Sequence, residues 1–275
     1  MRRRSAICQT LKFMPERHHS TVEGARFSAL LLTALCLMLP VPAPAQETSP
    51  APQPSGLRLR YGVEWRLIRA GNATLTTDAS LLPKQVQLQL QSVGLVNKLY
   101  RVDDRYSVTL NAKGCPVEVL LHAEEGKRRR DTRITFDHEA KKLNYLERDL
   151  LKNEVVLAKE LEIPACAFDI MGGLAHLRRQ KIDLGQSIQL PLTDGKKLVS
   201  ARVEAQEREE IRIPAGRFQT IRYEAFLFNN VLYGRKGRLF VWLTDDERRL
   251  PVQVRARLQF HVGTITLQLE KEERF

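Results

Sequence analysis

The sequence has few of the residues and none of the short motifs by which most metal proteins and enzymes can be recognised. It contains four cysteines and six histidines in 275 residues, and no two histidines after residue 45 stand two or four positions apart. The C-x-x-C and H-E-x-x-H spacings, the G-x-S-x-G nucleophile elbow and a phosphate-cradling glycine loop are all missing. We therefore predict no catalytic residue, no metal ligand and no cofactor, and expect a protein that is not an enzyme.

Two groups of polar residues could still suggest chemistry. Asp245 and Asp246 are adjacent carboxylates, and His138 lies between two acidic residues. Neighbouring strand residues point to opposite faces, so an adjacent pair rarely converges on one substrate atom. Asp forms turns through its own side-chain hydrogen bonds, and both groups are therefore interpreted as turns.

Long apolar runs are also missing. The basic start Arg2-Arg3-Arg4 precedes one apolar run, residues 27–39, and then Ala43-Pro44-Ala45. This order is typical of a secretory signal peptide, here residues 1–45 with cleavage near Ala45. The run is shorter than the roughly 20 residues that a membrane-spanning helix needs. We expect a periplasmic protein with no integral membrane segment after cleavage, beginning with a disordered tether at residues 46–56.

The charge is strongly basic. The formal net charge is +12 for the whole chain, and removal of residues 1–45 takes away six basic and two acidic residues, leaving +8. A basic exported protein is expected to meet lipid headgroups or other anionic envelope components. Nucleic acid is not an expected partner, and the oligomeric state stays open.

Only two cysteines, Cys115 and Cys166, remain after cleavage. In an oxidising compartment the pair could form one disulfide, which would close a long loop and stabilise the fold by about 4 kcal/mol in the chain-entropy model. Two separate buried thiols are the alternative, and the sequence does not decide between them.

Alternating apolar and polar residues dominate the rest of the chain. Residues 57–67 and 252–258 show this two-residue period most clearly, and short turn sequences such as Ala70-Gly71-Asn72 separate the segments. Only residues 164–180 break the rhythm, with helical spacing of apolar residues. We predict a mainly β fold over residues 57–275, a single domain in which a curved antiparallel up-and-down sheet closes toward a barrel or half-barrel with one short helix packed on it.

The strand at residues 238–243 is apolar on both faces, because Phe240 and Trp242 lie opposite Leu239, Val241 and Leu243. Such a strand needs a cover on each side. The predicted helix could supply the cover, or one face could line an apolar ligand cavity, as in barrels that hold lipid. For the second alternative the candidate lining residues are Phe226, Phe228, Phe240, Trp242 and Trp65.

Arg255 and Arg257 lie on one face of the strand that follows. They are a candidate anion-binding pair. The alternative is a solvated sheet face whose charges protect an edge against aggregation.

Four motifs resemble the exported bacterial family called domain of unknown function 3108. They are Leu-Arg-Tyr-Gly-Val-Glu-Trp with Ala-Gly-Asn-Ala-Thr-Leu, Phe-Asp-Ile-Met-Gly-Gly-Leu-Ala-His-Leu-Arg, Pro-Ala-Gly-Arg-Phe-Gln-Thr-Ile-Arg-Tyr-Glu and Val-Trp-Leu-Thr-Asp-Asp-Glu-Arg-Arg-Leu-Pro-Val. The resemblance covers residues 57–269 and implies an exported, β-rich protein. It brings no catalytic residues with it.

Three functions remain open from the sequence. The leading hypothesis is a non-enzymatic periplasmic protein that binds an apolar or amphiphilic envelope component. The second is a structural or interaction protein of the envelope that acts through its basic surface. The third is a hydrolase whose polar residues meet only in the folded chain.

Overall fold

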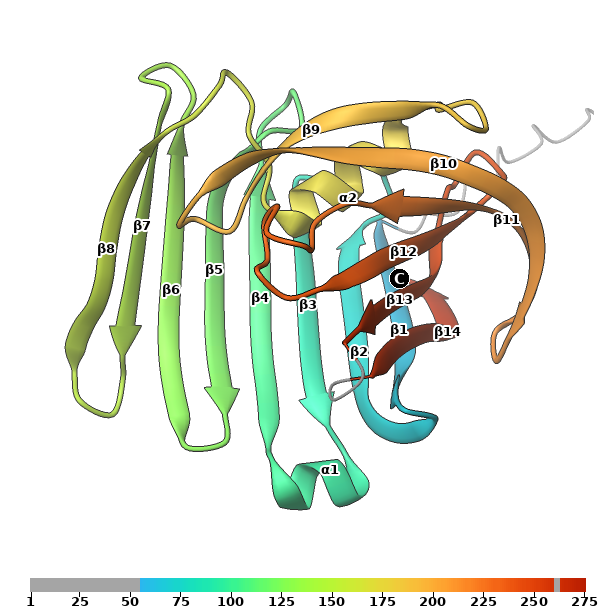
Figure 1. The fold of residues 1–275 in the computed structure, drawn as a ribbon, viewed down its shortest axis with the longest axis horizontal. Helices are drawn as coiled ribbons and strands as arrows, with labels where there is room; N and C mark the ends of the chain where they lie inside the picture. Colours follow the sequence, from blue (N-terminus) through green and yellow to red (C-terminus); the bar gives the residue numbers. More distant parts are fainter. Residues whose placement is uncertain (1–54, 260–262) are drawn as a thin grey trace, which may run out of the picture. The chain divides into compact units, whose positions relative to one another are not determined.

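The computed structural model describes residues 55–259 and 263–275. The predicted signal peptide and nearly all of the predicted tether lie outside the described residues. The described chain forms fourteen strands and two helices (Figure 1). In chain order these are β1 (Gly56–Trp65), β2 (Ile68–Asp78), β3 (Gln85–Ser92), α1 (Gly94–Leu99), β4 (Val102–Leu110), β5 (Pro116–Glu125), β6 (Arg128–Asp137), β7 (Lys142–Asp149), β8 (Glu154–Glu162), α2 (Ile170–Arg179), β9 (Ser187–Thr193), β10 (Leu198–Ile213), β11 (Gly216–Ala225), β12 (Gly237–Thr244), β13 (Pro251–Leu258) and β14 (Thr264–Arg274).

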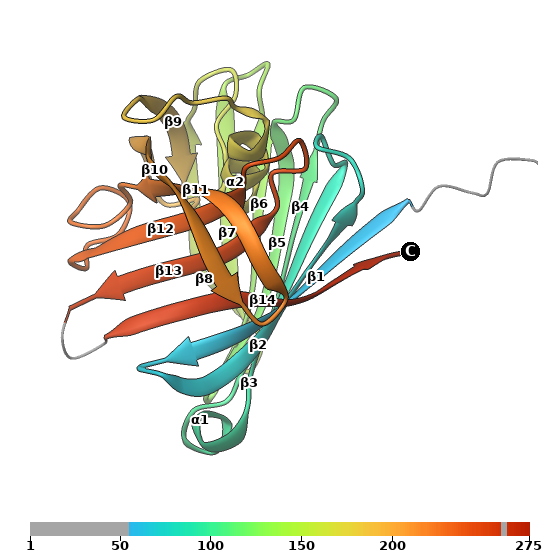
Figure 2. The same ribbon diagram turned by 90° about the vertical axis from the view of Figure 1, so that its right-hand side faces the viewer.

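All fourteen strands of the described residues belong to one antiparallel sheet in which consecutive strands pair, except β8 and β9. The order is β8-β7-β6-β5-β4-β3-β2-β1-β14-β13-β12-β11-β10-β9, so the first and last strands pair with each other and β8 and β9 form the two edges. Figure 2 shows that the curvature of the sheet in β3, β2 and β1 continues through β14, β13 and β12. The mainly β, up-and-down prediction is confirmed. The sheet remains open, because β8 does not pair with β9.

Side-chain alternation explains which face of the sheet turns inward. In β1, Leu57, Leu59, Tyr61 and Val63 are all buried, and in β14 the opposing Leu269 is 1% exposed. Because a strand directs every second side chain to the same face, these residues form one continuous apolar surface. Fully burying one such side chain stabilises the fold by about 1.5–3 kcal/mol. The core therefore follows the concave face.

The first turn differs from the sequence prediction. The chain reverses at Arg66 and Leu67, which both adopt positive φ angles of 50° and 68°, and Ala70-Gly71-Asn72 lies within β2. A Cβ atom on Gly71 would stand 2.5 Å from the backbone oxygen of Gln91 in β3. This glycine is therefore required for the close approach of two strands and not for a turn.

Two elements were not predicted from the sequence. Helix α1 has six residues and none of them is buried, while every residue of β8 is exposed or half-buried. Helix α1 is too short to show a helical period. In β8 the charged Lys159 interrupts the alternation of Val155, Leu157 and Leu161, of which Leu157 and Leu161 pack against the core.

Helix α2 is shorter than the predicted 164–180. It begins after Asp169, whose carboxylate accepts hydrogen bonds from the backbone N–H groups of Met171 (2.8 Å) and Gly172 (3.1 Å). Such a side-chain cap ends the extended segment and starts the helix. The two glycines inside α2 have a packing reason, since a Cβ on Gly172 would meet Pro116 at 2.9 Å and one on Gly173 would meet Leu192 at 2.7 Å.

The two edges of the sheet are brought together by side chains and not by strand pairing. The turn after β9 lies against β6 and β7, and a Cβ on Gly195 there would stand 2.3 Å from the ring of Tyr145. From edge strand β8, Lys159 donates a 2.5 Å hydrogen bond to the carbonyl of Lys196 in the same turn. Glu147 accepts hydrogen bonds from the Tyr145 hydroxyl (2.6 Å) and from Arg130, and lies 3.4 Å from the Lys196 ammonium.

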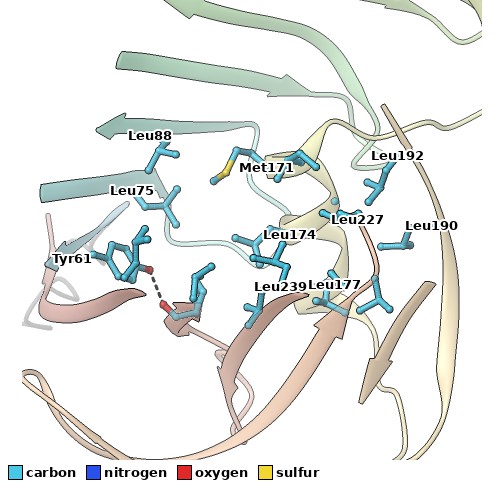
Figure 3. Close-up of a pocket in the computed structure, with 18 residues that line it drawn as sticks. Tyr61, Leu75, Leu88, Met171, Leu174, Leu177, Leu190, Leu192, Leu227 and Leu239 are labelled. Atoms are coloured by element: carbon cyan, nitrogen blue, oxygen red, sulfur yellow. Dashed lines mark hydrogen bonds between the residues drawn. The ribbon is translucent and has the colours of Figure 1, made fainter. Parts of the chain in front are cut away.

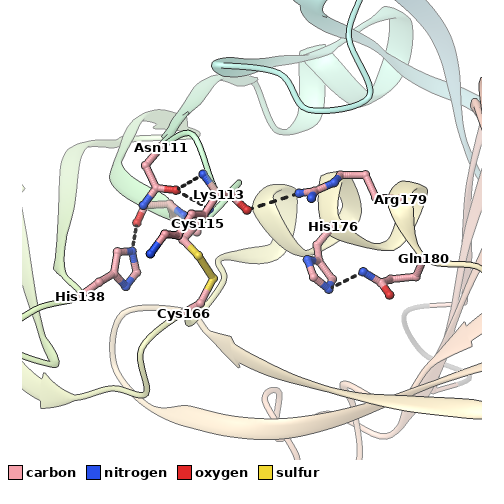
Figure 4. Close-up of a disulfide and its surroundings, with 9 residues drawn as sticks. Asn111, Lys113, Cys115, His138, Cys166, His176, Arg179 and Gln180 are labelled. Carbon is pink, nitrogen blue, oxygen red and sulfur yellow. Dashed lines mark hydrogen bonds between the residues drawn. A yellow bond between two sulfur atoms is a disulfide. The ribbon is translucent and has the colours of Figure 1, made fainter. Parts of the chain in front are cut away.

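A disulfide adds a covalent link between the β4–β5 turn and the segment before α2. Cys115, which precedes β5, is bonded to Cys166, which precedes α2, across 51 positions of sequence. Figure 4 shows the bond next to the first turn of α2. The segment between the two edges is thereby fixed to the turn that joins β4 and β5.

Replacing both cysteines by serine should lower the free energy of unfolding by about 4 kcal/mol, because the unfolded chain regains the entropy of a long open loop. Urea denaturation at constant pH measures the change. Wild-type protein unfolded in dithiothreitol should match the double variant. An unchanged denaturation midpoint in both samples would contradict a stabilising role for the bond.

The Glu147 cluster predicts a pH dependence. Burial raises the pKa of this carboxyl, but hydrogen bonds from Tyr145 and Arg130 and the charge of Lys196 outweigh burial and lower it from 4.5 to about 2. A carboxyl with a lowered folded-state pKa stabilises the protein above its unfolded-state pKa, and that contribution is lost as the pH falls. The stability advantage of wild type over Glu147→Gln should therefore shrink by up to about 3 kcal/mol between pH 4.5 and pH 2.

Chemical denaturation of both proteins across this pH range gives the comparison. The variant Glu118→Gln removes a half-exposed carboxylate that pairs with Arg133 at 3.4 Å, and controls for the loss of one surface charge. A difference between wild type and Glu147→Gln that stays constant down to pH 2 would show that the cluster does not stabilise the ionised carboxyl.

Candidate functional site

An apolar cavity lies between α2 and the concave face of the sheet (Figure 3). Its volume is about 220 Å³. The lining comes from α2, from β1–β3 and from β9–β14 with the loops at their ends, and consists of Tyr61, Leu75, Leu88, Ile170, Met171, Gly173, Leu174, Leu177, Leu190, Leu192, Val203, Ala225, Leu227, Leu239, Val241, Pro251, Val254 and Leu267. Helix and sheet thus leave a space between them that apolar side chains surround.

Strand register places the lining residues side by side. Leu239 and Val241 of β12 stand opposite Ala225 and Tyr223 of β11, and Val254 of β13 stands opposite Leu267 of β14. Directly opposed residues share a face of the sheet. The inward-facing residues of successive strands therefore form one apolar wall.

The helix supplies the other wall. Ile170, Met171, Leu174 and Leu177 follow one another at helical spacing and all line the cavity. Figure 3 shows Met171 directed from α2 toward Leu88 of β3. Gly173 lets this face of the helix come close to β9.

Tyr61 contributes the one side-chain hydroxyl of the lining, and it is already engaged. The hydroxyl donates a 2.6 Å hydrogen bond to the carbonyl of Pro251, which Figure 3 marks as a dashed line. Burial raises the pKa of Tyr61 far above its usual value, so the group stays neutral. With no charged residue in the lining, the cavity can hold an apolar group but offers no acid, base or nucleophile for a reaction.

Both ends of α2 are held by buried polar groups. Asp169, which is 1% exposed, accepts a 2.7 Å hydrogen bond from the Tyr106 hydroxyl in addition to the two backbone N–H groups. Burial raises the pKa of this carboxyl, while the hydrogen bonds from Tyr106, Gly172 and Met171 lower it in part. The Asp169 carboxylate caps α2 and also binds Tyr106, and so fixes the start of the helix against β4.

Arg178 holds the other end. It is 6% exposed and donates hydrogen bonds of 3.0 Å to the carbonyls of Arg248 and Arg249. Burial lowers the pKa of its guanidinium. These bonds join the last turn of α2 to the turn between β12 and β13, so the helix is attached to both halves of the sheet.

None of the five predicted lining residues lines this cavity. Phe240 and Trp242 are buried, at 4% exposure each, but they alternate with Leu239 and Val241 and so face outward. Trp65 lies at the end of β1 and is 36% exposed. Phe226 and Phe228 border a separate outer depression near Arg238.

Arginine side chains lie over the outward aromatic pair, and Glu209 of β10 accepts a 2.8 Å hydrogen bond from Trp242 Nε1. The guanidinium of Arg238 lies 4.8 Å from the ring centre of Phe240, that of Arg257 lies 5.4 Å from it, and that of Arg255 lies 5.2 Å from Trp242. The apolar stems of long cations can bury aromatic rings while their charges stay in water. This arrangement explains how a strand can be apolar on both faces without two cavities.

Arg255 and Arg257, the predicted anion-binding pair, are brought together here. Burial lowers the pKa of Arg255, and the nearby charges of Arg257 and Arg222 lower it further. Within residues 55–259 and 263–275, no carboxylate lies within ion-pair distance of Arg255 or Arg257, whereas Arg238 pairs with Glu224 at 2.6 Å.

The other polar candidates have structural positions. Asp246 accepts hydrogen bonds from the backbone of Arg248 and Arg249 and from the Thr244 hydroxyl, which makes the acidic pair part of a turn. His138 contacts the carbonyl of Pro116 at 2.6 Å through Nε2. In the described part of the chain, no three His, Cys, Asp or Glu side chains gather as a metal site would require. Among the same residues no helix has both the length and the hydropathy needed to cross a bilayer.

A protein-family model and a solved structure each match most of the chain. The model of a family described as "Protein of unknown function (DUF3108)" matches residues 60–270. No curated protein matches the sequence. A solved β-barrel-like protein of the DUF1849 family from Brucella abortus is similar, with a TM-score of 0.53 and 11% identity, over 82% of this chain and 100% of that chain.

A candidate lipoprotein from Parabacteroides distasonis matches with a TM-score of 0.31 and 12% identity, over 81% of this chain and 97% of that one. At 11% identity the likeness to the Brucella protein shows the fold alone. The weaker match carries no argument about function.

Proposed function

The chain belongs to the DUF3108 family, and we propose that it is a non-enzymatic binding protein whose interior cavity holds the apolar part of a cell-envelope component. The observation that carries this proposal is the cavity between α2 and the sheet, with its continuous apolar lining and its single, already bonded hydroxyl at Tyr61. Such a space favours an apolar ligand and has no group that would act on it.

The size of the cavity supports a ligand of modest length. A dry apolar cavity of about 150 Å³ in another protein binds benzene. At about 220 Å³ the cavity described here is larger. It would accept a short alkyl chain or a fused aromatic ring, although complete ligand sites commonly reach about 300–1,000 Å³.

Export to the periplasm is part of the proposal. It rests on the basic start, the apolar run at residues 27–39 and the Ala43-Pro44-Ala45 ending. A protein in that compartment has access to lipids and their breakdown products, which are amphiphilic. The disulfide between Cys115 and Cys166 suits an oxidising compartment as well.

A second candidate function is contact with an anionic envelope surface through the outer face of β12 and β13. Arg255 and Arg257 favour it, because they lie near Arg222 and Arg238 and have no carboxylate partner within the described ranges. Anions would offset the mutual repulsion of these charges. This surface lies on the face of the sheet opposite the cavity, so the two functions can be tested separately.

Filling the cavity should abolish binding of an apolar probe. In Ala225→Phe the new ring occupies space beside Leu239 and Val241, and the affinity for the fluorescent dye N-phenyl-1-naphthylamine should fall at least about tenfold, since a lost contact of about 1.4 kcal/mol has that effect. Fluorescence titration of both proteins measures it. Ala158→Phe, on exposed edge strand β8, is the matched control and should bind the dye as wild type does.

Wild-type protein that does not bind the dye, or Ala225→Phe that binds it unchanged, would contradict the cavity proposal. A second variant shows whether a loss of dye binding comes from a filled cavity or only from a less stable protein. Leu174→Ala enlarges the cavity and should keep or raise the affinity for the dye, although it lowers stability by about 2–5 kcal/mol.

Reversing two charges tests the second candidate function. Arg255→Glu combined with Arg257→Glu should remove binding to vesicles that contain phosphatidylglycerol, because each cation near an anionic surface contributes about 1 kcal/mol. Vesicle co-sedimentation at low salt is the measurement. The matched control reverses Arg58 and Arg60, which already pair with Glu273. Equal vesicle binding by all three proteins would remove this candidate.

A further inference from the structure

A second pocket adjoins the apolar cavity at the first turn of α2. Its volume is about 370 Å³, and Leu88, Ile170 and Met171 line both spaces. The rest of its lining comes from β4–β7, from the end of β9 and the turn after it, and from the loop before β12, and includes Tyr106, Tyr145, Asp194, Lys196 and Tyr233. The first turn of α2 therefore stands between an apolar space and a mixed polar one.

Two side chains of this polar pocket have hydrogen-bond donors to spare. Lys196 has three N–H donors, and its ammonium lies 3.4 Å from Glu147 and 5.2 Å from the ring centre of Tyr145. The side chain is 48% exposed, so part of it remains open to the pocket. Burial and the charges of Asp194 and Asp169 raise the pKa of Tyr233, whose hydroxyl therefore keeps its proton.

Asp194 is the one carboxylate of the lining, and its Oδ1 is held by the backbone of its own turn. Asp194 accepts hydrogen bonds from the backbone N–H groups of Lys196 (2.9 Å) and Lys197 (3.0 Å). Asp169 and Glu147 lie outside the lining, where Asp169 accepts a hydrogen bond from Tyr106 and Glu147 accepts one from Tyr145. The donors of Lys196 and Tyr233 in the lining favour a ligand group that accepts hydrogen bonds.

Met171 is suited to the boundary between the two spaces. It is half-buried, lines both of them and has an unbranched side chain with three rotatable bonds. Its flexibility suits a wall that must adapt to a ligand on either side. No polar group lies on the shared wall, which Leu88, Ile170 and Met171 form.

We propose that the two pockets form one site for a single-chain amphiphile that carries an acyl oxygen. The alkyl chain lies in the apolar cavity and passes Met171, and the acyl oxygen of the head accepts hydrogen bonds from Lys196 and Tyr233. This inference rests on the proposed function, because it requires an apolar ligand in the cavity. A free fatty acid and a monoacylglycerol both present such an oxygen, as a carboxylate and as an ester carbonyl.

Competition between two probes tests whether the pockets act together. Dodecanoate should displace N-phenyl-1-naphthylamine from the wild-type protein. Lys196→Gln should weaken dodecanoate binding about tenfold, the effect of losing one charge-assisted hydrogen bond, while the affinity for the dye stays unchanged. Tyr233→Phe removes the second donor without a change in charge and should weaken dodecanoate binding by a smaller factor. Lys152→Gln, at an exposed lysine outside both pockets, is the matched control.

Monododecanoylglycerol separates the two sources of the acyl oxygen. An equal loss of affinity for dodecanoate and for the glyceride in Lys196→Gln would assign the site to an ester or acid carbonyl. A loss for dodecanoate alone would assign it to a free carboxylate.

Failure of this inference can be told apart from failure of the proposed function. If wild type binds the dye but binds dodecanoate without displacing it, or if Lys196→Gln and Tyr233→Phe both bind dodecanoate as wild type does, the shared site is overturned and the apolar cavity stands. If neither probe binds to the wild-type protein, both proposals are overturned.

Discussion

The pairing of β1 with β14 determines how the rest of the structure can close. Because the first and last strands are neighbours, the other strands extend from them in two directions, and the sheet ends at β8 and β9, which are consecutive in sequence. The segment between these two edges contains Cys166 and α2. Closure therefore depends on a helix, a disulfide and a turn in place of a further row of strand hydrogen bonds.

This mode of closure also creates the interior space. A barrel closed by strand pairing and filled by its own side chains leaves little room for a ligand. Here α2 lies across the concave face, and its cap at Asp169 and its tie at Arg178 hold it to opposite parts of the sheet. The first turn of the helix borders both an apolar space and a mixed polar space. The same element thus stabilises the fold and divides the interior by polarity.

The two-residue period of the sequence was sufficient to predict a curved antiparallel sheet, because burial on one face dictates such a pattern. It was not sufficient to predict which face lines the cavity. In β12 both faces are apolar, and guanidinium groups of Arg238, Arg255 and Arg257, which come partly from the next strand, lie over the outward rings of Phe240 and Trp242. That cover depends on strand register, which is a long-range property.

Other features could not be predicted because they depend on contacts between residues that are far apart in sequence. Gly71 resembles a turn residue in sequence, but it serves a close contact with β3 that only the folded sheet reveals. Lys196 and Tyr233 are 37 positions apart and belong to separate loops, so no spacing could have joined them in one pocket. Residues 164–180 did predict the helix, and Leu174 and Leu177 within it proved to be part of the cavity wall.

The central claim is that the space under α2 holds the chain of a ligand. A crystal structure of the protein with 12-bromododecanoate tests it most directly, because anomalous scattering locates the bromine without any assumption about the pose. We expect the bromine peak between Leu174 and Val241, in the apolar cavity. A peak on the outer face beside Phe240 and Trp242, or a ligand bound wholly outside α2, would contradict it.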